Sequence, residues 1–218
     1  MSSSQTGPTS TTGSSASSAF NVVTCGALAG HVRDIAARRG WLVRVHALPA
    51  GLHNRPGQIP PQVQRAIDDL PPEAGSRTVV AYADCGTYGK LDEVCQRAGA
   101  SRLPGLHCYD LLAGPDTVRE LFHMEPGTYL LTDYLVRTFD RTVVASLGLD
   151  RHPELWPDYF SHYTRLAWLA QEPTPELEAR AGRIAERFGL PLTTINAGLS
   201  RLEAALAALI ENHPEEHT

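Results

Sequence analysis

Residues 20–26 read FNVVTCG, and residues 77–86 read RTVVAYADCG. Each stretch is a short apolar run rich in valine that ends in a cysteine followed by a glycine, which indicates a buried strand closed by a tight turn. A helical pattern follows each turn. In the first one, Leu28, Val32 and Ile35 fall on one face of residues 27–39. Strand, turn and helix in this order form the unit from which parallel sheets are built.

The same unit recurs along the chain. Further strands are expected over residues 41–48, 103–106, 128–132, 166–169 and 190–194. Further helices are expected over residues 63–70, 90–97, 110–123 with a break at Gly114-Pro115, 134–146, 175–188 and 199–210. This order predicts one α/β domain over residues 19–210, with a mostly parallel, Rossmann-like sheet, helices on both of its faces and a helix-rich C-terminal part. Ligands of such sheets bind outside the carboxyl ends of the strands.

Composition narrows the class of protein. The chain has 218 residues, of which 42% are hydrophobic, and a formal net charge of −5, so a packed core is expected and a broad nucleic-acid-binding face is not. Residues 1–18 are a polar, Ser/Thr-rich stretch that is predicted to be a disordered tail, and residues 211–218 are predicted to fray. Neither end resembles an export signal or a membrane span, so we expect a cytoplasmic location and no membrane partner.

Three of the four cysteines share one position in the pattern. Cys25, Cys85 and Cys108 each follow a predicted strand and precede a helix, whereas Cys95 lies within a helix and is expected to pack in the core. Because the carboxyl ends of parallel strands meet at one edge, the three thiols are expected to converge there. A helix N-terminus also favours the thiolate form that ligates metals. The alternative is that all three are packed core residues, since free cysteine is often buried.

Further candidates complete the predicted site. His53, in a loop rich in proline and glycine after the second strand, is the preferred fourth metal ligand, although it could instead form a hydrogen bond within its loop. Three cysteines and a histidine suit zinc, and three cysteines with an open position suit an iron–sulfur cluster. Asp110 and Asp133 are candidate acid/base groups, with helix capping as the alternative role. The spacing is not a CxxC pair, and dinucleotide, P-loop and zincin motifs are absent from the sequence.

Several segments, taken in order, resemble the family of unknown function called DUF1638. They are CGALA at 25–29, LPAGLHNRPGQI at 48–59, CGTYGKLD at 85–92, LHCYDLLAG at 106–114 and EPGTYLLTD at 125–133. The resemblance implies a shared fold over about residues 20–210 and supports the four candidate metal ligands. Some relatives accompany corrinoid-dependent methyltransferases, which implies by analogy a corrinoid or methyltransferase partner.

The leading expectation is therefore a metal-binding α/β protein with a zinc or iron–sulfur site, acting on a small molecule or within a corrinoid-linked methyl-transfer system. Two alternatives stay open. One is a non-catalytic accessory protein that delivers or senses a metal or a corrinoid, and the other is a thiol redox protein that uses Cys85 and Cys108, which no CxxC motif supports.

Overall fold

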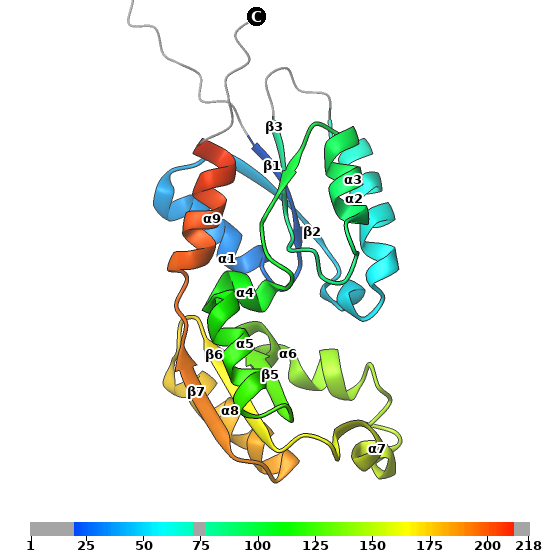
Figure 1. Cartoon of the computed structure of the whole chain (residues 1–218), viewed down its shortest axis with the longest axis vertical. Coiled ribbons are helices and arrows are strands. Elements are labelled where there is room, and N and C mark those ends of the chain that lie inside the picture. Colours follow the sequence, from blue (N-terminus) through cyan, green and yellow to red (C-terminus); the bar gives the residue numbers. More distant parts are fainter. Residues whose placement is uncertain (1–19, 72–76, 212–218) are drawn as a thin grey trace, which may run out of the picture.

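The computed structural model describes residues 20–71 and 77–211 (Figure 1). The predicted tail over residues 1–18 lies outside the described residues, and so does all but the first residue of the predicted C-terminal tail. The strands of the structure are β1 (Phe20–Cys25), β2 (Val43–Leu48), β3 (Arg77–Ala81), β4 (Ser101–Arg102), β5 (Thr128–Thr132), β6 (Arg165–Ala170) and β7 (Leu192–Asn196). Its α-helices are α1 (Ala29–Arg39), α2 (Ile59–Asp68), α3 (Lys90–Arg97), α4 (Cys108–Ala113), α5 (Pro115–Met124), α6 (Asp133–Phe139), α7 (Trp156–Phe160), α8 (Pro175–Phe188) and α9 (Ser200–Glu211).

The α/β class and the parallel strands are confirmed, but the described strands form two sheets where one was expected. The first sheet has the order β2-β1-β3-β4 and the second the order β5-β6-β7, and every pairing in both is parallel. The repeating strand–helix unit is the same whether a new strand extends an existing sheet or starts another. The local pattern therefore predicted the strands but not their division.

In the first sheet, the direction in which successive strands are added reverses at β1. From β1 the chain passes through α1 to β2 on one side, and from β2 it passes through α2 to β3 on the other side of β1. In Figure 1, α1 and α9 cover one face of this sheet and α2 and α3 cover the other. The neighbouring carboxyl ends of β1 and β3 thus form a topological switch point, the usual ligand position in open α/β sheets.

Successive side chains of β6, in the second sheet, pack alternately into two cores. Leu166, Trp168 and Ala170 of β6 pack with α6 and α8, while Ala167 and Leu169 pack with α5. This period-two pattern with apolar residues on both faces is the pattern of a fully covered parallel strand.

The two sheets point their carboxyl ends toward each other. In Figure 1, β1 runs down toward the middle of the molecule, β7 runs up toward it, and α4 lies between the two sheets. Each sheet and the helices packed on it form one lobe. After β7 the chain returns to the first lobe, where Leu202, Leu206 and Ile210 of α9 join the core around β1 and β3. The carboxyl edges of the two sheets therefore face a shared central region.

Some predicted boundaries differ from the observed ones. The strand expected over residues 103–106 is paired earlier, at Ser101–Arg102, and the following residues run beside the end of β3, where Asp84 N donates to Gly105 O at 3.0 Å. The helix expected over residues 134–146 is α6 followed by a π-helical turn, Asp140–Val144. Among the described helices, none combines the length and the apolar character needed to cross a membrane.

Candidate functional site

The structure places the three predicted cysteines at the carboxyl edge of the first sheet. Cys25 is the last residue of β1, Cys85 follows β3, and Cys108 is the first residue of α4. Cys85 N donates to Leu106 O at 2.8 Å, which holds the segment before Cys108 against the end of β3. Burial is the main cause of the raised pKa values of Cys85 and Cys108, and a charge on Cys25 would raise both further, as a charge on Cys85 would raise that of Cys108. The three side chains thus share one electrostatic environment.

Each thiol also meets backbone N–H groups. Burial raises the pKa of Cys25, and the N–H groups of Ala27 and Leu28 oppose that shift. Burial raises the pKa of Cys85 to about 11 against an opposing N–H of Cys108, and it raises the pKa of Cys108 well above its usual value. The thiols are therefore protonated at neutral pH, but the N–H groups are placed to stabilise thiolates once a cation removes the protons.

A buried tyrosine hydroxyl lies beside these thiols. Tyr82, 2% exposed, has the only fully buried side-chain polar atom in the described part of the chain that forms no hydrogen bond. The Cys25 thiol is its neighbour, and the contact between the two groups acts to lower the pKa of Cys25 and to raise that of Tyr82. Burial raises the pKa of Tyr82, and the charges of Cys25 and Cys85 raise it further. A buried hydroxyl without a hydrogen bond costs free energy unless a bound group donates or accepts one.

The turn that carries Cys85 is strained. Cys85 and Tyr88 have φ values of 51° and 52°, and Tyr88 is 92% exposed. Left-handed backbone at non-glycine residues persists only where the surroundings enforce it, and such strain is concentrated at functional sites.

Asp84 is the group that enforces the turn. Its carboxylate accepts hydrogen bonds from the backbone N–H of Gly86, Tyr88 and Gly89 at 3.1 Å each, and from the Thr87 hydroxyl at 2.8 Å. Burial acts to raise the pKa of Asp84, but these hydrogen bonds outweigh it and the pKa lies below its usual value. Asp84, which the sequence analysis did not select, is therefore the residue that positions Cys85. The signal available was an aspartate directly before a Cys-Gly turn.

The thiols are near one another without forming a compact ligand set. In the described part of the chain, the only group of three or more His, Cys, Asp or Glu ligand atoms lying within 4.8 Å of one another is His31, Asp34 and Glu172. His53 is exposed, and its Nδ1 lies 2.7 Å from Ala50 O. His53 thus makes the local hydrogen bond that was the alternative to metal ligation, and no three-ligand group that includes it meets the distance limit among the described residues.

The remaining sequence candidates have structural partners. Cys95 is buried in the core of the first lobe, as expected. Asp110 Oδ2 accepts hydrogen bonds from the backbone N–H of Leu106 at 2.9 Å and His107 at 3.1 Å, so its carboxylate caps the approach to α4 and positions Cys108. This is the capping role that had been the alternative to acid/base chemistry.

Asp133 lies at the carboxyl edge of the second sheet and is fully buried. Its Oδ1 accepts hydrogen bonds from Trp168 Nε1 at 2.9 Å and Gln171 N at 3.1 Å, and its Oδ2 accepts one from Glu172 N at 2.8 Å. The carboxylate is thus surrounded by donors and joins the start of α6 to the segment that follows β6.

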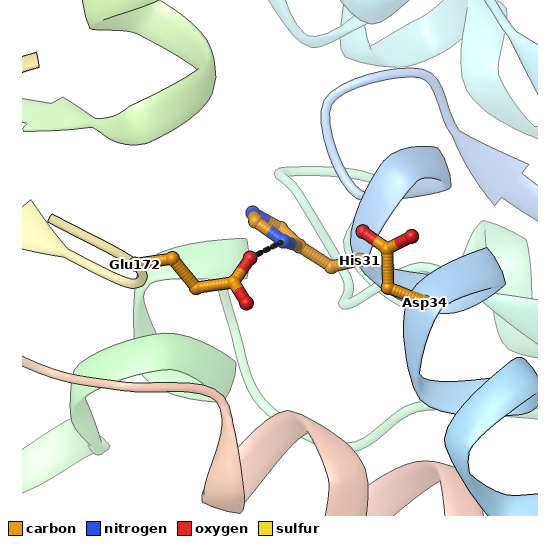
Figure 2. Close-up of side chains that lie close together, drawn as sticks. All are labelled: His31, Asp34 and Glu172. Atoms are coloured by element: carbon orange, nitrogen blue, oxygen red, sulfur yellow. Dashed lines mark ion pairs between the residues drawn. The ribbon is translucent and has the colours of Figure 1, made fainter. Parts of the chain in front are cut away.

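A group that the sequence analysis missed connects the two edges. Figure 2 shows Glu172, from the segment after β6, directed toward His31 on α1, with Asp34 on the same helix. His31 Nδ1 lies 3.8 Å from Glu172 Oε2, and the His31 side chain is 9% exposed. The only sequence signal was the i, i+3 spacing of His31 and Asp34, which is common on helices and does not indicate the distant third member.

Comparison with known proteins identifies the family and nothing further. A search of curated proteins and a search of solved structures both gave no match. Residues 47–206 match the model of the DUF1638 family, described as a protein of unknown function. The match includes His53, Cys85 and Cys108, and it begins after Cys25 and His31. Because the matched residues make up most of the chain, the protein belongs to the DUF1638 family.

Proposed function

We propose that this protein binds a thiophilic metal centre, a zinc ion or an iron–sulfur cluster, through Cys25, Cys85 and Cys108. The observation that carries the proposal is the combination, at one sheet edge, of three thiols that each meet backbone N–H groups and the buried Tyr82 hydroxyl beside Cys25. Thiolates with backbone N–H donors are the ligands that zinc and iron–sulfur clusters take in proteins, and their hydrogen bonds tune the bound group.

The raised pKa values of the thiols favour this role over thiol redox chemistry. A reactive cysteine needs a lowered pKa, whereas burial raises the pKa of all three candidates. A metal cation supplies the missing positive charge, so binding would release protons at neutral pH.

The fourth coordination position of such a centre is where a substrate would bind. Because His53 is held by Ala50 O, the proposal leaves that position to an external ligand. When bound, such a centre would polarise a small substrate or activate a thiol, which is the chemistry that methyl transfer to or from a corrinoid partner requires. Tyr82 would orient a ligand there, and Asp84 and Asp110 would hold the loops that present Cys85 and Cys108.

The test is anaerobic purification followed by metal analysis and absorbance spectroscopy. We expect stoichiometric zinc in a colourless protein, or iron and sulfide in a coloured one, with the content lost in Cys25→Ser, Cys85→Ser and Cys108→Ser variants. Cys95→Ser is the matched control, because Cys95 is also buried in the first lobe but lies within α3, away from the edge. Metal-free wild-type protein that remains metal-free after reconstitution would overturn the proposal, as would equal loss in the Cys95→Ser control.

A further inference from the structure

A cluster of metal-ligating side chains lies where the two lobes meet. His31 and Asp34 come from α1 in the first lobe, and Glu172 follows β6 in the second (Figure 2). One ligand atom from each lies within 4.8 Å of the other two. Atoms bound to one cation at about 2.0–2.2 Å lie roughly 3–4 Å apart, so small side-chain rotations suffice to bring the three to ligation distance.

His31 is a nearly buried imidazole that faces Glu172. Its side chain is 9% exposed, and among the described residues the ring's contact is the one with Glu172. The contact with Glu172 Oε2, at 3.8 Å, is beyond hydrogen-bonding distance.

The opposite ligand is held in place by the buried network around Asp133. Glu172 N donates to Asp133 Oδ2 at 2.8 Å, which fixes the backbone from which the Glu172 side chain extends. That side chain is 50% exposed, so its carboxylate is free to move toward a cation while its backbone stays anchored. Asp133 is therefore a positioning residue for this cluster, much as Asp84 is for Cys85.

We propose that His31, Asp34 and Glu172 form a site for a first-row divalent cation of the Mn²⁺, Fe²⁺ and Zn²⁺ class, which bridges the two lobes. One imidazole and two carboxylates form a mixed nitrogen and oxygen set, which suits these cations and leaves coordination positions for water or an anionic ligand. The site shares no residue with the thiol centre, and it ties α1 to the end of β6.

Mn²⁺ is the probe that separates the two sites, because it prefers carboxylate and imidazole ligands over thiolates. Titration of the full chain, followed by electron paramagnetic resonance of free Mn²⁺, should show one bound ion per chain. His31→Gln, Asp34→Asn and Glu172→Gln should each weaken the affinity by about tenfold or more. Bound Mn²⁺ should also raise the unfolding temperature of the wild type, and this increase should be smaller in the three variants.

The chain offers a matched control pair. His152 and Glu154 lie 3.2 Å apart on the surface without a third ligand that meets the 4.8 Å limit in the described part of the chain, so His152→Gln should leave Mn²⁺ affinity unchanged. Cys85→Ser should also leave it unchanged, which keeps this result independent of the thiol centre. Circular dichroism of the metal-free variants checks folding, and the exposed Asp34 provides a variant that does not disturb the core. Wild-type protein that binds no stoichiometric Mn²⁺, or equal weakening by His152→Gln, would overturn the proposal.

Discussion

Replacing Asp84 by Asn tests how the thiol-bearing turn is held. The amide oxygen of Asn can still accept from the Thr87 hydroxyl and Gly89 N–H, but its NH₂ group would face the N–H groups of Gly86 and Tyr88. Two hydrogen bonds to a charged acceptor are lost. At about 1.5 kcal/mol each, the low end of the range because this turn is partly exposed, Asp84→Asn should destabilise the protein by about 3 kcal/mol.

Urea denaturation of the two proteins measures this difference in the free energy of unfolding. Because the native pKa of Asp84 is depressed, its carboxylate stabilises the fold above the unfolded pKa, and that stabilisation is lost as the pH falls through the native pKa. The difference between wild type and variant should therefore shrink in acid. Asp116→Asn is the control, since Asp116 is exposed and pairs only with Arg119 on α5. A loss for Asp84→Asn no larger than that of the control would refute the role given to Asp84.

Three further perturbations have equally direct readouts. Asp133→Asn should cost about 2–4 kcal/mol in urea denaturation, because a buried acceptor of three hydrogen bonds is disrupted; a change below 1 kcal/mol, on the order of a single neutral bond, would contradict this. Gly26→Ala should destabilise by about 1–3 kcal/mol, because the new Cβ would lie 2.7 Å from Leu48 O; an unchanged urea midpoint would show that the backbone gives way freely. Since burial lowers the pKa of His31, wild-type stability should fall as the pH drops below the usual value of 6.5, and metal-free His31→Gln should lose less over the same range; parallel pH profiles would argue against a neutral His31.

Local pattern was sufficient for the elements and for the edge on which the cysteines lie. Valine-rich runs ending in Cys-Gly predicted β1 and β3, and parallel pairing then brought Cys25 and Cys85 to neighbouring strand ends. Those conclusions need only the period of the side chains and the geometry of parallel strands.

The contacts that distinguish a ligand from a structural group were beyond the sequence. Asp110 and His53 have the right residue types, but only the fold shows that the first caps α4 and the second binds its own loop. His31 and Glu172 were missed for the opposite reason, since neither is unusual in its own segment. Their proximity depends on how two separate sheets face each other, which no short-range periodicity encodes.

The return of the chain to its first lobe affects how the protein is made. The second lobe is contiguous in sequence, from Pro115 to Asn196, whereas the core around β1 and β3 needs Leu202, Leu206 and Ile210 of α9. During synthesis the strands of the first sheet leave the ribosome first, but the face that α1 and α9 share is only partly covered until α9 emerges. The second sheet and its helices can therefore fold before the first core is complete, which reverses the usual N-terminal-first order. An N-terminal fragment ending at α4 would expose the part of that face that α9 covers, and we expect it to aggregate.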